Sequence, residues 1–450
     1  MKIVVCVKVI KGEINPFDAS AIECALQLSD DVTVVSMGPS STETVLLPLT
    51  RLGVRVILIT DSLFVGSDTL ATAYILSKAI QTLHPDLILC GRQSVDGDTA
   101  QVGPMLSAML GISLITNALQ VEKNENGITA KTRLGTESTT FPALVTVERS
   151  YTLRFPSIFS KLGEVCLLTN KELNCDIKRC GLAGSPTRVL ETFENEKGKR
   201  RCRFISMDAL KPLLTILQQQ KVIKKNVHTK QKMLPCAWAI GKEVFEKACE
   251  IAENVVLIEK TDVYSIVKKV QEEKPGVVLW NGDLWGRRNA PIAAALLQTG
   301  LCADCTQLAA EEDTLIMYRP ARGGNVYAKI KCLTKPQMAT VRTKTASSDI
   351  IVSGGRGIAD RIDTLYAFAN EIGAELAASR GLVDTGKMPY DLQVGLTGKS
   401  VSPKIYIAIG ISGAVHHTCA IENADTVIAI NPDKNARIFE YADYGIVDAF

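Results

Sequence analysis

The chain has 450 residues, of which 46% are hydrophobic and 22% charged, as is ordinary for an α/β protein of roughly two to four domains. Its formal net charge of +3 gives no indication of nucleic acid or an acidic membrane as a partner. No apolar run approaches the roughly 18 residues of a membrane span, and the N-terminus reads as a strand without a signal-peptide layout. The 13 scattered cysteines suit reduced thiols. We therefore expect a protein of a bacterial-type cytoplasm.

Short apolar runs alternate with helical patterns through the first third of the chain. This alternation is typical of parallel sheets covered by helices, as in nucleotide-binding α/β domains. The helix and strand propensities alone would fit many other α/β folds as well. The helices that we expect are Ala19–Leu28, Thr69–Leu83 and Val102–Leu110. The strands that we expect are Ile3–Val7, Val32–Met37, Arg55–Ile59, Leu87–Cys90 and Ala143–Val147.

The loop that opens the helix Val102–Leu110 has the composition of a nucleotide-binding loop. The Thr99 hydroxyl can donate a hydrogen bond, and the free N–H groups of the first helical turn can hold phosphate. Asp96 and Asp98 disfavour a bare anion unless they cap the helix or meet ribose hydroxyls. Helix capping and ligand binding therefore stay equally open.

The region Glu194–Leu234 differs in character from what precedes it. Lys197–Arg203 is basic, Ser206 is placed to cap a helix that runs to about Val222, and several lysines surround His228. Charge runs of this kind are usually solvated. We interpret the region as a linker plus the C-terminal helix of a first module, and infer no nucleic-acid binding from it.

Two stretches of the chain follow the same plan. Asp86–Cys90 leads from a strand into a glycine loop, a helix and a late Pro-led strand in Thr139–Val147. Gly276–Trp280 leads in the same order to Leu333–Arg342. We infer two homologous α/β modules, with chance similarity of two βα units as the alternative. A third unit begins at Asp349.

The third unit opens with a glycine loop, Ser353–Gly357, between the apolar run Ile350–Val352 and an expected helix Asp360–Ile372. Such a loop can place a pyrophosphate at the N-terminus of the helix, with Arg356 neutralising charge. A tight turn that needs positive φ is the alternative.

The most informative stretch of the third unit is Gln393–His417. Its strand Ile405–Ile409 ends in Gly410–Ala414, which His416 and His417 follow directly. Glycines at the end of a strand let backbone N–H groups approach a ligand, and we expect the helix that follows to add its positive dipole end. A threonine hydroxyl and imidazoles beside such a loop suit a polar, redox-active ring better than a bare phosphate.

Other motifs indicate neither a metal site nor a hydrolytic centre. Cys302–Cys305 is an isolated CxxC without a second pair at metal spacing, so we expect buried structural cysteines. His416 and His417 lack a cluster of partner ligands, and the chain has no Ser-His-Asp arrangement, Walker loop or HExxH. We therefore expect no metal and neither a hydrolase nor a kinase.

Together these motifs resemble an electron transfer flavoprotein whose beta-type and alpha-type subunits are fused head to tail. The first part resembles the beta subunit through MKIVVCVK, INPFD, GSDTLAT, GRQSVDGDTAQVGP and GLAGSPTRV, and the later part resembles the alpha subunit through TGLCADCT, RPARGGN, KPQMATVR, SGGRGI, AASRGLVD, QVGLTGK, GISGA and ADYGIV. The resemblance implies an α/β fold with two adenine-nucleotide-hydrolase-like parallel-sheet modules, over residues 1–225 and 226–345, and a C-terminal doubly wound FAD-binding domain over residues 346–450.

The resemblance implies FAD, bound mainly by the last domain. In family terms Arg380 lies against the flavin ring, Thr397 hydrogen-bonds flavin N5, and His417 approaches the O2/N1 edge. Because reduced flavin gathers negative charge at that edge, a cation there raises the potential. The full set implied for FAD is Arg356, Gly357, Ser379, Arg380, Gln393, Val394, Gly395, Thr397, Gly398, Gly410, Ser412, Gly413, Ala414, His417, Asn431 and Asp448.

A second nucleotide is implied in the beta-like module. Family members hold either AMP or a second FAD there, and the form of the Gly91–Pro104 motif favours FAD slightly. The residues implied for this site are Val7, Gly97, Asp98, Thr99, Ala100, Gln101, Val102 and Gly103.

The chain departs from the family pattern at several positions. Leu396 and His416 replace residues that are usual beside the flavin, and the loop between Lys8 and Ile14 is short, which argues against NADH access. The lysine-rich docking loop of the family corresponds here to Arg154–Pro156 and the following Ser157–Cys166, with one lysine. This weakens the case for an ordinary acyl-CoA dehydrogenase as partner.

Three functions remain open from the sequence. The first is an electron carrier that works through FAD with an acyl-CoA-dehydrogenase-like or other flavoprotein oxidoreductase. The second is a bifurcating enzyme with FAD in both halves, which adds NADH and ferredoxin as partners. The third is a nucleotide-binding regulatory protein that has lost electron transfer.

Overall fold

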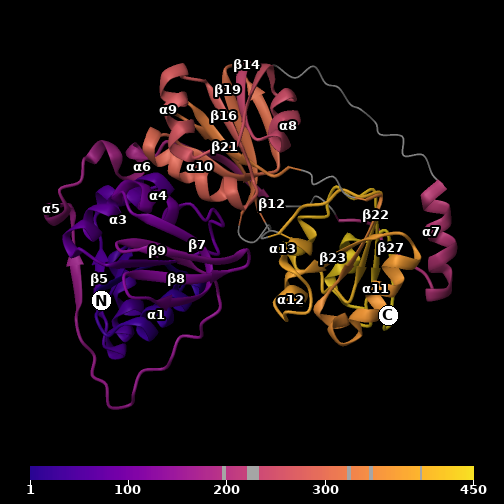
Figure 1. Ribbon diagram of the computed structural model, residues 1–450, viewed down its shortest axis with the longest axis horizontal. Coiled ribbons are helices and arrows are strands. Elements are labelled where there is room, and N and C mark those ends of the chain that lie inside the picture. Colours follow the sequence, from indigo (N-terminus) through magenta and orange to yellow (C-terminus); the bar gives the residue numbers. More distant parts are fainter. Residues whose placement is uncertain (195–198, 220–232, 322–325, 344–347, 396–397) are drawn as a thin grey trace. The chain divides into compact units, whose positions relative to one another are not determined.

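The computed structural model describes residues 1–194, 199–219, 233–321, 326–343, 348–395 and 398–450 (Figure 1). The chain forms two compact units. Unit 1 comprises Met1–Thr192, Lys232–Arg322 and Ala328–Val341, and unit 2 comprises Phe193–Gln231, Gly323–Tyr327 and Arg342–Phe450. No helix within the described ranges is long and apolar enough to cross a membrane.

The largest sheet of unit 1 has nine strands in the order β11-β5-β4-β1-β6-β10-β7-β8-β9. Pairing is parallel from β11 to β7 and antiparallel through β7, β8 and β9. Its strands are β1 (Ile3–Val7), β4 (Val32–Met37), β5 (Arg55–Ile59), β6 (Leu87–Gly91), β7 (Ser113–Lys123), β8 (Gly127–Thr132), β9 (Gly135–Thr140), β10 (Ala143–Val147) and β11 (Val165–Leu168). Its helices are α1 (Pro16–Leu28), α2 (Glu43–Leu46), α3 (Thr69–Leu83), α4 (Val102–Leu110), α5 (Asn170–Leu173) and α6 (Gly181–Gly184), and β2 (Val9–Ile10) pairs with β3 (Glu13–Ile14).

The second sheet of unit 1 has five parallel strands in the order β15-β14-β16-β21-β17. These are β14 (Leu234–Ile240), β15 (Ala252–Ile258), β16 (Val277–Asn281), β17 (Leu301–Cys305) and β21 (Gln337–Val341), with helices α8 (Phe245–Cys249), α9 (Val263–Glu273) and α10 (Leu284–Leu297). A four-stranded sheet has the order β12-β20-β19-β18, with β12 (Thr187–Glu194), β18 (Gln307–Glu311), β19 (Thr314–Ala321) and β20 (Val326–Cys332).

The two parallel sheets of unit 1 share one topology. The strand order β4-β1-β6-β10-β7 of the first corresponds, element by element along the chain, to β15-β14-β16-β21-β17 of the second. Both βα units that the sequence pairs, β6 with α4 and β16 with α10, occupy corresponding places in this order. The shared topology supports the internal repeat inferred from the sequence.

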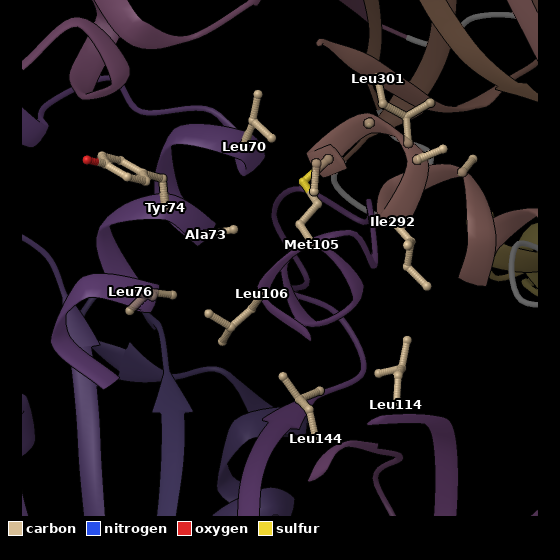
Figure 2. Close-up of a cluster of buried hydrophobic side chains, with 14 of the residues drawn as sticks. Leu70, Ala73, Tyr74, Leu76, Met105, Leu106, Leu114, Leu144, Ile292 and Leu301 are labelled. Atoms are coloured by element: carbon tan, nitrogen blue, oxygen red, sulfur yellow. The ribbon is translucent and has the colours of Figure 1, made fainter. Parts of the chain in front are cut away.

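One hydrophobic cluster joins the two sheets of unit 1 through their helices. Figure 2 shows side chains of α3 and α4, among them Leu70, Met105 and Leu106, in one cluster with Ile292 of α10 and Leu301 of β17. Met105 and Leu106 are fully buried. Burying a side chain of this size stabilises a fold by roughly 1.5–3 kcal/mol. The packing in this cluster therefore contributes substantially to holding the two sheets of unit 1 together.

Unit 2 is a doubly wound domain. Its seven-stranded sheet has the order β13-β27-β26-β25-β22-β23-β24, and all pairings are parallel. Its strands are β13 (Arg203–Phe204), β22 (Ile350–Gly354), β23 (Glu375–Ser379), β24 (Gln393–Val394), β25 (Ile405–Ile409), β26 (Thr426–Ile430) and β27 (Tyr444–Ile446), and its helices are α7 (Leu210–Gln219), α11 (Ile362–Glu371), α12 (Arg380–Val383) and α13 (Val415–Thr418). β22 and β25 are buried along their whole length, which explains why they read as continuous apolar runs.

The predicted α/β fold class is confirmed, with one local correction. We expected the helix after Ser206 to belong to the first module, but Leu210 and Leu214 of α7 are buried in the core of unit 2. Just before it, the Arg203 N–H donates to Asp443 O at 2.8 Å. The module boundaries at residues 225 and 345 were drawn from the family resemblance, and they stay a prediction.

Candidate functional site

The first candidate site lies at the carboxyl ends of β22 and β25, where the strand order of unit 2 reverses. Ligands of doubly wound sheets bind in the crevice at this point. The two loops there approach each other closely: the Gly355 N–H donates to Ile409 O at 2.7 Å, and the Gly357 N–H donates to Gly410 O at 3.2 Å. A Cβ atom on Gly355 would lie 2.0 Å from Gly410 O, so only glycine fits.

Groups that can bind an anion gather at this edge of the sheet. Among the described residues, the N–H groups of Ser412, Gly413 and Ala414 have no hydrogen-bond acceptor, and the exposed Arg356 has no ion-pair partner. Gly413 has a positive φ of +84°, and a Cβ atom there would lie 2.1 Å from Ile438 N, so only glycine fits. This chemistry fits a pyrophosphate group.

The helix after this loop corrects one expectation. We expected a helix dipole from the segment that begins after Ala414, but α13 spans only Val415–Thr418. A single turn sums few peptide dipoles. The free N–H groups of the loop therefore carry the attraction for an anion.

The end of β23 brings further predicted residues to the same edge. A Cβ atom on Gly381 would lie 3.6 Å from the Arg356 Cβ and 3.9 Å from the Ser379 Oγ. Arg380 follows Ser379 directly, and its Nε donates to Asp384 Oδ2 at 3.2 Å. The structure thus brings Arg356 close to Ser379 and Arg380, which belong to a later segment of the chain.

The turn that follows β24 packs against α13. A Cβ atom on Gly395 would lie 2.8 Å from His416 O, and one on Gly398 would lie 2.2 Å from Gln393 O. Gln393 and Val394 are buried. Thr397, predicted to donate to flavin N5, lies outside the described residues together with Leu396.

His417 is held inside the domain between two partners. Its Nδ1 lies 3.1 Å from Val394 O, and its Nε2 lies 2.9 Å from the Tyr406 hydroxyl. Since a carbonyl only accepts, Nδ1 carries the proton and Nε2 accepts from Tyr406. Burial lowers the pKa of His417 to about 4. At neutral pH the ring is therefore uncharged, and in this arrangement it does not supply the cation that the sequence argument places at the O2/N1 edge.

Two further predicted residues have different surroundings. Asn431 supports the glycine loop, because its Nδ2 donates to Ile411 O at 2.9 Å. Asp448 is exposed and accepts from the neighbouring Ala449 N–H at 2.7 Å. It follows β27, which β26 and β25 separate from β22. Within the described residues, no hydrogen bond or ion pair joins Asp448 to the loops of the crevice.

The second candidate site is a cavity of about 340 Å³ in unit 1. It lies at the carboxyl ends of β1 and β6, and the loop before α4 forms one wall. The predicted residues that line it are Val7, Gly97, Thr99, Ala100, Gln101, Val102 and Gly103. Asp98 does not line the cavity: it is 9% exposed, and its Oδ1 accepts from Gln93 Nε2 at 3.0 Å.

Sequence reasoning missed two residues that hold the walls of this cavity, Asn15 and Asp18. The Asn15 Nδ2 donates to Gln93 O at 2.9 Å. Asp18 accepts from the N–H groups of Lys8 at 2.8 Å and Gly91 at 3.2 Å. Burial raises the pKa of Asp18 to about 7. Both belong to the INPFD motif, whose polar residues at the start of α1 were a signal for this role.

An exposed apolar loop, residues 155–162, belongs to unit 1 and does not line its cavity. Phe155, Ile158 and Phe159 are 95%, 85% and 87% exposed. The base of the loop is held by Arg154, whose Nη2 donates to Glu23 Oε1 at 2.7 Å. Exposed apolar clusters of this kind mark contact surfaces.

Most of the chain is similar in sequence to known proteins. The sequence profile described as electron transfer flavoprotein domain matches residues 3–151 and 240–357, and the one described as electron transfer flavoprotein FAD-binding domain matches residues 344–422. The electron transfer flavoprotein subunit alpha of Thermoanaerobacterium thermosaccharolyticum is 41% identical over 230 residues, which are 41% of this chain and 70% of that protein. Protein FixB of Clostridium saccharobutylicum is 37% identical over 236 residues, which are 42% of this chain and 71% of that protein.

Proposed function

Because the chain belongs to the electron transfer flavoprotein family, we propose that it is an electron carrier that works between a donor and a partner flavoprotein through FAD held in unit 2. The observation that carries this proposal is the anion-binding edge at the strand-order reversal of unit 2, within the part of the chain that matches the FAD-binding domain. FAD, when bound, takes up and passes on electrons.

The residues of unit 2 have separate roles in holding FAD. Arg356 and the N–H groups of Ser412, Gly413 and Ala414 hold the pyrophosphate, and Gly357 and Gly410 let the backbone approach it. Arg380 and Ser379 border the ring. Gln393 and Gly395 border the other side of the ring, where the resemblance also implies Thr397. His417 and Asn431 fix the turn and the glycine loop in position.

We further propose that the chain joins a beta-type half to an alpha-type half. Two separate matches to one domain profile and the shared strand order of the two sheets support this proposal. Joining the halves in one chain raises their effective concentration and fixes a one-to-one ratio.

The cavity of unit 1 is proposed to hold an adenine nucleotide, either AMP or a second FAD. Its volume of about 340 Å³ falls at the lower end of the roughly 300–1,000 Å³ usual for ligand sites. A second FAD would make NADH-driven bifurcation a candidate function. If NADH fails to bleach any bound flavin under anaerobic conditions, bifurcation from NADH is rejected.

The apolar loop, residues 155–162, is proposed as the surface that docks the partner oxidoreductase. Arg51 holds the backbone of the loop in place: its Nη2 donates to Ser157 O at 3.0 Å and its Nε to Ser160 Oγ at 3.3 Å. With Lys161 as its one charged residue, the loop matches an apolar recess on the partner better than an acidic surface.

An anaerobic titration tests the electron-carrier proposal. The full-length chain is reduced stepwise, and an oxidised acceptor flavoprotein is then added. We expect the flavin absorbance to be bleached on reduction and restored on addition of the acceptor, with the electrons recovered in the acceptor. A chain without flavin absorbance, or with bound flavin that passes no electrons on, would contradict the electron-carrier function.

A further inference from the structure

We propose that Arg319, a residue of the alpha-like half, is a positioning residue that sets the nucleotide loop of the beta-like half in its binding conformation. This inference rests on the proposed nucleotide site of unit 1. Arg319 belongs to β19 and is only 5% exposed. It lies more than two hundred residues along the chain from the loop that it contacts.

Each of the three guanidinium nitrogens of Arg319 donates to a backbone carbonyl. Its Nε donates to Ala303 O at 2.7 Å, which fixes it to β17. Its Nη1 donates to Gly97 O at 2.8 Å and its Nη2 to Asp98 O at 3.2 Å. Arginine presents these donors in a rigid planar fork, so lysine cannot replace them all.

These contacts act on a loop that needs outside support. Asp98 and Ala100 have positive φ values of +53° and +54°, a conformation that costs energy for residues other than glycine. A second contact from the alpha-like half reaches the same loop, because Gln101 Nε2 donates to Leu301 O at 3.1 Å. The loop conformation is therefore held by the other half of unit 1.

The direction of one peptide group links Arg319 to the ligand. In a planar trans peptide the C=O and the following N–H point in opposite directions. Because Asp98 O points to Arg319, the Thr99 N–H points away from it. Thr99 lines the cavity, and its N–H has no acceptor among the described residues. Arg319 thus turns the Thr99 N–H toward a ligand phosphate that it does not itself touch.

The test measures the dissociation constant of AMP with the full-length, flavin-loaded chain by equilibrium dialysis. Since hydrogen bonds from a charged donor are at stake, Arg319→Lys and Arg319→Gln are expected to weaken AMP binding about 10-fold to 100-fold while flavin content stays the same. Arg288→Gln is the matched control. Arg288 also joins the two halves of unit 1, with its Nη2 donating to Leu114 O at 2.7 Å, but among the described residues it donates no hydrogen bond to the nucleotide loop.

Chemical rescue separates positioning from general loosening. Added guanidinium is expected to strengthen AMP binding to Arg319→Ala, whereas methylammonium is not, because only the planar ion reproduces the fork. Equal AMP affinity in the unmodified chain and Arg319→Lys would overturn the inference, as would an equal loss in Arg288→Gln. If the unmodified chain binds neither AMP nor a second FAD, the proposed nucleotide site is rejected, and the inference is rejected with it.

Discussion

Replacing His417 with glutamine is predicted to remove an acid sensitivity from unit 2. In the native domain the imidazole is buried and uncharged between Val394 O and the Tyr406 hydroxyl. An unfolded chain can protonate this ring freely, whereas the folded domain resists it. Glutamine keeps a donor and an acceptor but has no ionisable group.

The size of the effect follows from the pKa of His417, which burial lowers from 6.5 to about 4. A group whose pKa is lowered by folding contributes stability that is complete above the unfolded pKa and is lost as pH falls through the folded one. Between about pH 7 and pH 5 the linkage relation gives a loss of about 2 kcal/mol, and about 3 kcal/mol once pH falls below 4.

Urea unfolding at about pH 7 and pH 5 measures this difference. All three tryptophans lie in unit 1, so their fluorescence identifies the transition of unit 1, and circular dichroism follows the remainder. The native chain is expected to lose about 2 kcal/mol more than His417→Gln on acidification. His416→Gln is the matched control, because this neighbouring imidazole is exposed. Equal losses in the native chain and His417→Gln would show that the buried imidazole does not cause the acid sensitivity.

Three further predictions concern other parts of the chain. Folding raises the pKa of Asp18 to about 7, so its contribution to unit 1 is present at low pH and is lost as pH rises through 7; between about pH 5 and pH 8 tryptophan-detected stability should fall by about 2–3 kcal/mol, and Asp18→Asn should remove this fall. Gly355→Ala should destabilise unit 2 by about 1–3 kcal/mol and lower the flavin content per chain, whereas Gly381→Ala, whose nearest neighbour is 3.6 Å away, should not. Phe159→Ser should slow electron transfer to the partner about 10-fold with unchanged flavin content, and Leu134→Ser, which changes an apolar side chain 74% exposed elsewhere, should leave the rate unchanged.

Much of the fold was accessible from the sequence because buried parallel strands are continuous apolar runs. β1, β4, β5, β10 and β25 have the predicted bounds, as do α3 and α4. The sequence assigned α7 to the first module, whereas it packs in unit 2. The pattern of an amphipathic helix shows which face is buried but not which part of the protein that face packs against. Its partner, the core around β22, lies well over a hundred residues later in the chain.

The candidate sites were accessible only in part. Glycine loops at strand ends mark a binding edge, and the structure brings Arg356 and Ser379 together there as the strand order requires. The role of Arg319 had no local signal, because its partners are carbonyls of a distant loop. The neutral state of His417 likewise depends on Tyr406 and Val394, which only the folded domain brings around it.

The nucleotides released from the purified full-length chain show whether it carries the FAD that an electron carrier needs. The protein is denatured, and the released nucleotides are separated and counted per chain. We expect one FAD per chain together with one further adenine nucleotide, AMP or a second FAD. Adenine nucleotide without any FAD would contradict the electron-carrier function and favour a regulatory protein that carries no electrons.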